Sequence, residues 1–223
     1  MRPDDAPSPS LRSPGRLPAA LLLLVAAVLA WSGVGPRDRL TWWLEVAPVL
    51  LAAPILVATR RRFPFTPVVY VLVAIHAAVL CVGGHYTYAE VPLGFWARDL
   101  LGLSRNHYDR VGHLMQGFVP VLVVRELLLR TSPLRPGKWL AVLATGVVLA
   151  LSAVYEFVEW WTALILGQGA DAFLGSQGDP WDTQTDMFMC LVGAVAAQLL
   201  LARVQDRQLA RMPGTSGGER LAA

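Results

Sequence analysis

The sequence is poor in charged residues and contains only two cysteines. Charged side chains make up 16% of the 223 positions, whereas apolar side chains make up 55%. This balance excludes an ordinary water-soluble core and is typical of a polytopic membrane protein. Cys81 and Cys190 both lie in apolar stretches without zinc-ligand spacing, so they are interpreted as packing residues. The sequence also shows no internal repeat and no water-soluble domain.

Long apolar windows dominate the sequence instead. Each has about 17 to 20 residues, enough to cross a hydrocarbon layer of roughly 30 Å. Lipid cannot satisfy bare backbone groups, so each window must be helical. The sequence therefore predicts an all-α, polytopic membrane bundle of about six transmembrane helices. The windows are Leu17–Val34, Leu40–Ala58, Pro67–Gly83, Val111–Leu129, Trp139–Phe157 and Met187–Val204.

The basic residues predict the orientation of the bundle. Thirteen Lys and Arg residues flank one set of window ends, and five flank the other. By the positive-inside rule both termini are cytoplasmic, in a multi-pass protein of the inner (plasma) membrane. Arg125 lies inside a window and is expected to snorkel toward the basic side. The sequence pI of about 9.2 is then explained by topology and anionic lipid, and no nucleic-acid partner is expected.

The chain divides into three parts. Residues 1–16 are rich in Pro and Ser and are expected to be a disordered cytoplasmic N-terminus. Residues 17–204 form the six-helix transmembrane domain, and residues 205–223 a polar cytoplasmic tail. An alternative for Leu17–Ala30 is a cleaved signal peptide. The longest connections, Gly84–His107 and Leu166–Gly178, fall on the outer side, and long connections are often functional.

The most polar stretch runs from Gly175 to Met187 and contains three acids in eight residues. Asp179 before Pro180 predicts a helix N-cap with proline at the first helical position. Asp182 is then expected to bond back to the cap, and Asp186 follows one turn later on the same face. Two carboxylates at the start of an apolar helix need a metal, a base or a cationic substrate as partner.

Other polar residues are predicted at the same depth, near the outer end of the bundle. Because ionisable groups inside a membrane usually face an internal cavity, this convergence indicates a functional site. No comparable set is expected in the cytoplasmic half. The residues are Glu45, His85, Tyr86, Glu90, Asp109, His113, Gln116, Glu156, Glu159, Asp182 and Asp186.

Several of these features have simpler interpretations. Asp109 and Arg110 can form an interfacial ion pair that only anchors a helix. His76 can be a hydrogen-bonded packing residue, and Glu45 can hydrogen-bond a neighbouring helix. The tryptophans Trp42, Trp43, Trp160, Trp161 and Trp181 are expected to form an interfacial belt.

Three blocks carry a resemblance to a known family: Tyr108–His113, Tyr155–Trp160 and Gly175–Met187. Together they resemble the YjdF family of bacterial inner-membrane proteins, over about Arg37 to Val204. More weakly, Asp109, Arg110 and His113, then the Glu and Asp pairs, are similar to blocks of VanZ-like membrane proteins. The chain lacks a clear counterpart of the Arg and Asn usual in the last VanZ-like block. The resemblance supports a site but names no reaction.

The leading hypothesis is an enzyme at the outer leaflet that acts on a lipid-linked or envelope substrate. The candidate cofactor is a divalent cation such as Mg²⁺, Mn²⁺ or Zn²⁺, which would polarise a phosphoryl or acyl group or activate water. Alternatively, His113 is a general base. Membrane lipid is the expected partner, and the sequence does not determine the oligomeric state. Candidate catalytic residues are His113, Asp109, Glu156, Glu159, Asp182 and Asp186; candidate metal ligands are His113, Glu159, Asp182 and Asp186; candidate substrate-contacting residues are His85, Gln116, Gln177 and Asp179.

Two further classes of function remain open from the sequence. Intramembrane acids and His76 could relay protons in an ion-coupled transporter. The one-sided acids and the lack of a repeat argue against that reading. A polar cap could equally bind a partner protein or a lipid head group in a non-catalytic envelope factor.

Overall fold

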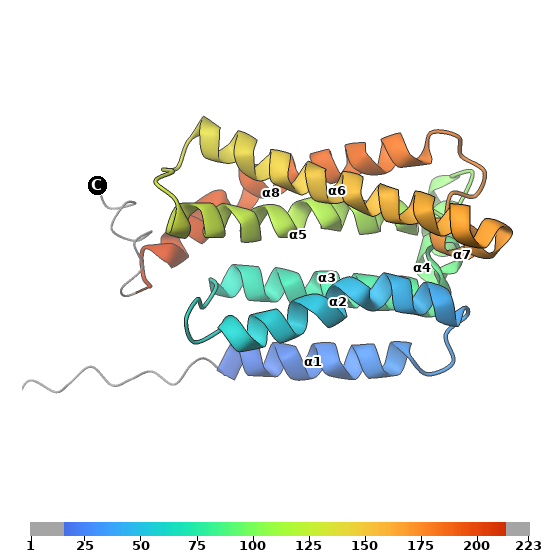
Figure 1. Ribbon diagram of the computed structural model, residues 1–223, viewed down its shortest axis with the longest axis horizontal. Coiled ribbons are helices and arrows are strands. Elements are labelled where there is room, and N and C mark those ends of the chain that lie inside the picture. Colours follow the sequence, from blue (N-terminus) through green and yellow to red (C-terminus); the bar gives the residue numbers. More distant parts are fainter. Residues whose placement is uncertain (1–15, 213–223) are drawn as a thin grey trace, which may run out of the picture.

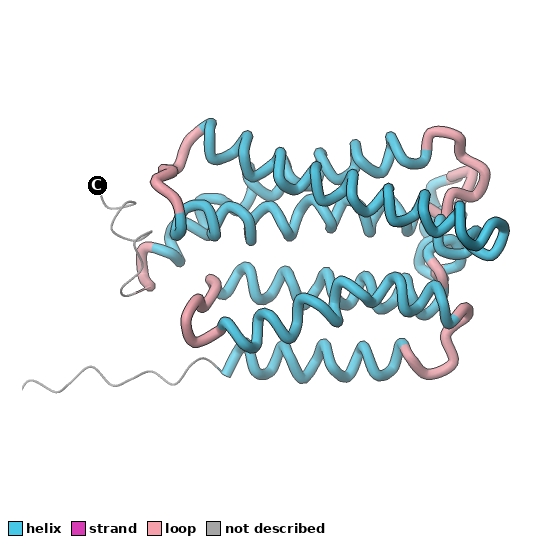
Figure 2. The backbone as a smooth tube through the Cα atoms, viewed as in Figure 1, coloured by secondary structure: helices cyan, strands magenta, loops and turns pink. Residues whose placement is uncertain are grey.

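The computed structural model describes residues 16–212, and these form a bundle of helices joined by short loops (Figure 2). Of the segment 1–16 that was predicted to be disordered, only Arg16 is described, and it begins the first helix. Residues 1–15 and the tail beyond Met212 lie outside the described residues. The elements are α1 (Arg16–Ser32), α2 (Arg39–Thr59), α3 (Pro67–Tyr86), η1 (Tyr88–Glu90), α4 (Pro92–Leu101), α5 (Tyr108–Thr131), α6 (Lys138–Leu166), η2 (Gly167–Ala170), α7 (Asp171–Leu174) and α8 (Asp182–Leu209).

All six apolar windows form helices, which confirms the all-α, multi-pass class. Five of them, α2, α3, α5, α6 and α8, are long and apolar enough to cross a membrane. The sixth, α1, has 17 residues, the lower limit for a spanning helix. The structure extends α8 to Leu209, past the predicted boundary at residue 204.

The long helices lie in two groups of three (Figure 1). α1 and α2 pack on α3, whereas α5, α6 and α8 pack on one another, and the two groups meet mainly where α3 contacts α5. The largest apolar core lies along this contact and includes Val69, Val121, Leu122, Val148 and Ala194. The arrangement makes α5 the central helix of the bundle.

Two glycines let α5 and α8 approach each other closely. A Cβ added at Gly117 would lie 1.9 Å from the Cys190 carbonyl oxygen, and one added at Gly193 would lie 2.0 Å from that of Leu114. Small residues at helix contacts are typical of membrane bundles, where close backbone packing replaces the hydrophobic effect. This contact sets the distance between the polar residues that the two helices carry.

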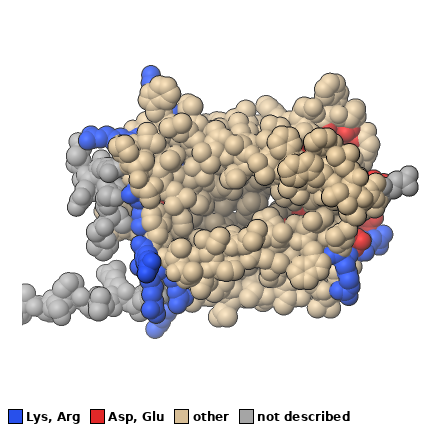
Figure 3. All heavy atoms as spheres, viewed as in Figure 1, with Lys and Arg blue, Asp and Glu red and all other residues tan. Residues whose placement is uncertain are grey.

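The two ends of the bundle differ in charge. In Figure 3, Lys and Arg gather at the end where α1 begins and α8 ends, whereas Asp and Glu appear at the opposite end together with further Lys and Arg. Helix α1 begins and helix α8 ends at the same end of the bundle, as an even number of crossings requires. The acidic end is called the outer end and the other the inner end, following the charge rule; that orientation stays a prediction. Trp43, Trp160, Trp161 and Trp181 are exposed, but Trp42 donates its indole N–H to Ser32 (3.0 Å) and packs inside.

The connection after α3 is more structured than the sequence suggested. It contains α4, an amphipathic helix whose Leu93, Trp96, Leu100 and Leu101 are exposed. Asn106 holds the end of this segment, because its side chain donates to the Val91 carbonyl (2.9 Å) and accepts from the Tyr108 N–H (3.0 Å). Its amide packs directly on Gly94, where a Cβ would lie 1.8 Å from the amide oxygen.

The start of α8 differs from the prediction. The helix begins at Asp182 and not at Pro180, and Asp182 does not bond back to a cap. Asp179 still accepts the Trp181 N–H (3.0 Å), but its other oxygen pairs with two arginines. The arginines are close to Asp179 and Asp182 only in the folded structure, so the local sequence could not identify them as partners. Because they bind both acids, the predicted capping arrangement does not form.

The inner end holds a buried polar cluster that the sequence analysis did not expect. Glu126 is fully buried and accepts bonds from the backbone and hydroxyl of Thr66, from Arg130 and from Gln205. Arg125, expected to snorkel toward the basic side, is buried at the inner end, where it pairs with Asp206 (2.7 Å) and donates to Gln205 (3.0 Å). These residues, Thr66, Arg125, Glu126, Arg130, Gln205 and Asp206, are called the inner cluster.

Candidate functional site

A cavity of about 250 Å³ lies between α2, α3, α5 and α6, toward the outer end. Its polar wall residues come from each of these helices: Glu45, His76, Asp109, His113, Gln116, Tyr155 and Glu159. The predicted convergence of ionisable residues from separate helices is therefore present as geometry. His85 and Glu90 do not take part, and α3 contributes His76 instead.

His113 is the centre of a group of acids. Its Nε2 lies 3.5 Å from Asp109 Oδ1 and 3.9 Å from Asp186 Oδ2, and its Nδ1 lies 3.8 Å from Glu156 Oε1. All four side chains are at least nine-tenths buried. They come from α5, α6 and α8, the three helices expected to pack around the site. Arg110 pairs with Asp179 (2.8 Å), so the ion pair considered between Asp109 and Arg110 is not the one that forms.

Several acid oxygens around His113 have no hydrogen-bond partner within residues 16–212. They are Asp109 Oδ2, both oxygens of Glu156 and Asp186 Oδ1. Buried polar groups are nearly always paired, and unpaired carboxylate oxygens are especially costly. Neighbouring carboxylates also repel one another unless protons or a cation neutralise them. The group of acids is therefore incomplete as a purely structural network.

Gln116 orients the imidazole of His113. Its Oε1 lies 3.0 Å from His113 Nδ1 and also accepts from Ser152 (3.4 Å). An amide oxygen accepts a hydrogen bond, so His113 carries a proton on Nδ1, and a cation would bind through Nε2. Nε2 is the nitrogen that faces Asp109 and Asp186. Residues that do not bind a metal themselves commonly fix the orientation of a metal-binding histidine by a hydrogen bond of this kind.

Two sets of ligand atoms are close enough to share one metal ion. Asp109, His113 and Asp186 form one set, and His113, Glu156 and Glu159 form the other, each with its atoms within 4.8 Å of one another. The first set can use the free Nε2, whereas Nδ1 on the side of Glu156 is already held by Gln116. The Gln116 oxygen at Nδ1 therefore favours Asp109, His113 and Asp186 as the metal ligands, with Glu156 and Glu159 beside them.

Asp182 lies apart from these sets. It binds Arg105 (2.8 Å), and Arg105 also contacts Asp179 (3.2 Å) and the Ser176 carbonyl. Arg110 pairs with the same Asp179 carboxylate (2.8 Å). The ion pairs join the loop before α5 to the loop before α8. Burial and the neighbouring Arg110 and Arg105 lower the pKa of His107 at this end, so its ring stays neutral at pH 7.

The remaining predicted residues have local partners. Gln177 donates to the Asn106 carbonyl (2.7 Å) and accepts from its N–H (3.3 Å), which holds Gln177 at a left-handed φ of 48°. His85 bonds the Ser32 carbonyl (3.0 Å) and stacks near Trp31, outside the cavity. Glu45 accepts from Tyr155 of α6 (3.3 Å), the expected bond to another helix. His76 was predicted to be a hydrogen-bonded packing residue. Its Nε2, however, has no hydrogen-bond partner within the described residues.

Sequence reasoning missed the aromatic wall of the cavity. Tyr88 fits between α3 and α5 because Gly83 and Gly112 leave room for its ring; a Cβ would lie 2.3 Å or 2.6 Å from it. Burial and the nearby Glu45 raise the pKa of the Tyr88 phenol well above its usual value, so it is a neutral hydroxyl. The two glycines, one near the end of α3 and one near the start of α5, were the signal in the sequence. Glycines alone do not identify which side chain fills the space that they leave.

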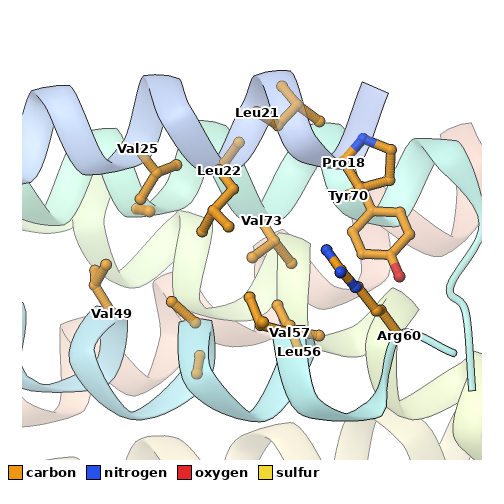
Figure 4. Close-up of a pocket in the computed structure, with 14 residues that line it drawn as sticks. Pro18, Leu21, Leu22, Val25, Val49, Leu56, Val57, Arg60, Tyr70 and Val73 are labelled. Atoms are coloured by element: carbon orange, nitrogen blue, oxygen red, sulfur yellow. The ribbon is translucent and has the colours of Figure 1, made fainter. Parts of the chain in front are cut away.

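A separate apolar pocket lies between α1, α2 and α3 (Figure 4). Leu21, Leu22, Val25 and Val73 project into it, and Arg60 and Tyr70 lie at its inner end. Its volume is about 90 Å³ and it contains no acid or histidine among its lining residues. It has no carboxylate or imidazole that could hold a metal ion, so the outer cavity is the candidate functional site.

The helical bundle and its buried acids define a polytopic membrane protein with an intramembrane polar site. A family of predicted membrane proteins, DUF2238, matches residues 17–207, and the chain belongs to this family. The chain is 52% identical to inner membrane protein YjdF of Escherichia coli (strain K12) over 189 residues, 85% of this chain and 90% of that protein. No solved structure matches the chain. The resemblance to the YjdF family and the inner-membrane location are thereby confirmed, and the weaker similarity to VanZ-like proteins stays a prediction.

Proposed function

We propose that the protein is an integral-membrane enzyme that acts on a lipid-linked or envelope substrate with the help of a divalent cation. Asp109, His113 and Asp186 would bind the cation, and Glu156 and Glu159 would flank it. The proposal revises the ligand set expected from the sequence, because Asp182 is engaged by Arg105. A site near the outer end of the bundle lies close to the level of lipid head groups.

The observation that carries the proposal is the set of unpaired, buried carboxylate oxygens on the acids that surround His113. Acid oxygens and one imidazole nitrogen suit Mg²⁺, Mn²⁺ or Zn²⁺. A three-residue ligand set leaves coordination positions open for water or substrate, as in catalytic metal sites. The cation would also neutralise the mutual repulsion of the acids.

A bound cation would supply two kinds of chemistry. It would polarise a phosphoryl or acyl oxygen, or lower the pKa of a bound water so that hydroxide forms near neutral pH. Glu156 and Glu159 lie on the same side of His113 and would accept a proton from such a water. The cavity wall adds neutral phenols from Tyr88 and Tyr155, which are suitable donors to a substrate oxygen.

Metal content tests this proposal directly. The full chain is purified in detergent, equilibrated in turn with Mg²⁺, Mn²⁺ and Zn²⁺, and its bound metal is measured by elemental mass spectrometry. We expect stoichiometric binding of at least one of these ions to the wild-type protein. Asp186→Asn should abolish this binding, because it replaces a ligand oxygen by an amide.

Asp182→Asn is the matched control, since Asp182 lies one turn earlier on α8 and contacts Arg105 instead. It should keep the metal. Wild-type protein without bound metal under all three conditions would refute the cation. Equal loss in both aspartate variants would instead show that binding depends on the start of α8 as a whole.

The enzymatic part needs a measurement in cells. A deletion strain is complemented with wild type or His113→Gln, and lipids and envelope precursors are compared by untargeted mass spectrometry. We expect one precursor to accumulate in the deletion strain and in the His113→Gln strain at equal protein levels. Complementation by His113→Gln would rule out a ligand or base role for that histidine.

A carrier is the second candidate, and one observation favours it. His76 lies deeper than His113 on the same cavity and has an unpaired Nε2, which would extend a proton path toward the bilayer centre. Proton-driven flux in proteoliposomes that is lost in His76→Leu would favour this function. Metal binding without flux would favour the enzyme.

A further inference from the structure

A second, larger cavity adjoins the site and has a different chemistry. It is a groove of about 530 Å³ bounded by α2, α3, α5 and α6. Of the described residues that line it, all except Thr59 and His76 are apolar. Along α2 it extends from Pro48 to Thr59, about 17 Å at 1.5 Å per residue.

The groove and the polar cavity are continuous. Pro48, His76, Leu80, Pro120 and Leu151 line both of them, so the apolar groove begins where the polar wall ends. Pro48 and Pro120 lie inside helices α2 and α5. A molecule that occupied both cavities would have one polar end near His113 and one apolar end near Thr59.

The groove is open to the side of the bundle. The two groups of three helices meet mainly along α3 and α5, and Figure 3 shows the face hollowed between α2 and α6. Ile55 and Leu127, from opposite walls, are exposed at this opening. In a membrane the opening faces hydrocarbon, so lipid and not water is the phase that meets it.

We infer that the groove holds one hydrocarbon chain of a membrane lipid whose polar group enters the cavity around His113. The groove is apolar along nearly its whole length, and its extent is close to half of a hydrocarbon layer of roughly 30 Å. A chain there would pack against the apolar walls of the groove without leaving any charge unpaired. The reacting polar group would be neutral, or anionic with the cation as its partner, because the cavity wall is acidic.

This inference rests on the proposed function for the chemistry at the polar end, but chain binding is measured separately. The probes are two forms of phosphatidylethanolamine with a diazirine on one acyl chain, either next to the ester or at the chain end. Each is incorporated into liposomes with the full-length protein and photolysed, and labelled peptides are identified by mass spectrometry. The ester-side probe should label residues near Leu80 and Leu151, and the chain-end probe should label the segment from Ile55 to Phe63.

Two substitutions test whether this labelling depends on the groove. Ile55→Trp and Leu127→Trp place a large ring in its opening and should lose most of the labelling. Leu51→Trp is the matched control, because Leu51 precedes Ile55 by one turn of α2 and is similarly exposed (68% against 61%) but does not line the groove. It should be labelled like wild type. Both groove positions are exposed, so the larger side chain does not have to enter the packed core.

The results separate this inference from the proposed function. Labelling that is unaffected by Ile55→Trp and Leu127→Trp would overturn the groove site, even if the metal binds. The reverse order of the two probes would mean that the head group lies at the inner end, and would also overturn it. Asp186→Asn should lose metal and keep chain labelling. Groove labelling in a protein that never binds metal would refute only the cation.

Discussion

Both ends of the bundle bury ionisable side chains, but they partner them differently. At the inner end, each carboxylate of the inner cluster faces an arginine, as Glu126 faces Arg130 and Asp206 faces Arg125. At the outer end, His113 is surrounded by acids, several of whose oxygens have no partner among the described residues. The inner network therefore has a cation for each of its carboxylates within the protein. An unpaired network of the same depth points to a ligand.

The largest expected effect comes from breaking a pair of the inner cluster. Arg125→Ala would remove a buried arginine and leave the partly buried Asp206 without its cation, and removal of one partner of a buried pair costs up to about 3–5 kcal/mol. We expect a loss of this size in the free energy of unfolding, measured in detergent with chelator present. Asp186→Asn under the same conditions should not destabilise the protein, because it removes repulsion between acids.

Equal losses for Arg125→Ala and Asp186→Asn would contradict the comparison. In that case the outer acids would be a structural network like the inner cluster, and the search for a ligand would lose its basis.

The next effect concerns the glycine contact between α5 and α8. Gly117→Ala forces a Cβ against the Cys190 carbonyl oxygen, and such overpacking costs about 1–3 kcal/mol. It should also weaken metal binding, because His113 and Asp186 lie on the two helices that must separate. Gly146→Ala on α6 is the control: no atom lies within 4 Å of its added Cβ, and alanine favours the helix by up to about 1 kcal/mol. An increase in the free energy of unfolding for Gly117→Ala would contradict this prediction, because it would show that α5 and α8 accommodate a methyl group at this contact.

A smaller effect is expected from Gln116, which contacts His113 without being a ligand. Gln116→Leu removes the acceptor at Nδ1, and loss of such an orienting group typically lowers metal affinity by about 10–100-fold. Titration of the metal-free protein measures the change. Gln198→Leu removes a comparable amide that bonds Thr145 away from the cavity, and should leave affinity unchanged. Unchanged affinity in Gln116→Leu would mean that Nε2 is not the ligand atom.

The smallest effect should come from a pair at the outer surface. Arg37 and Glu90 lie 2.7 Å apart but are largely exposed to solvent, and exposed ion pairs contribute about 0–1 kcal/mol. Arg37→Ala should therefore change the free energy of unfolding by less than that and leave metal binding intact. A larger loss in the unfolding measurement would show that the connection after α3 depends on this pair, and that exposure alone does not separate structural charges from the site.

The positions of the long helices could be predicted because apolar length is a local property of the sequence. The same windows placed Asp109, His113, Glu156 and Asp186 at one depth, and this part of the site followed from counting residues. Which charged residues pair with one another could not be predicted by counting residues. Asp182 and Asp186 share a helix face and were treated alike, yet only Asp182 meets Arg105, whose contacts lie more than 70 residues away.

The inner cluster and α4 were missed for related reasons. Arg125 and Gln205 are 80 residues apart, and each alone is simply a polar residue near a helix end. The ten residues of α4 are too few to span a membrane, and Arg98 and Asp99 interrupt their apolar side chains, so they produce no long apolar window. Local signals identify spanning segments; contacts between distant segments decide which charges are satisfied.

The central place of α5 has a consequence for biosynthesis. This helix carries polar residues at both ends, and their partners Asp186, Gln205 and Asp206 all belong to α8, which is made last. A ribosome adds about 5–20 residues per second, so α5 waits a few seconds for those partners after it leaves the ribosome. During that interval α5 is poorly suited to lipid, and we expect it to stay beside the insertion machinery until α8 arrives. A chain truncated before α8 should consequently be recognised and degraded as an orphan.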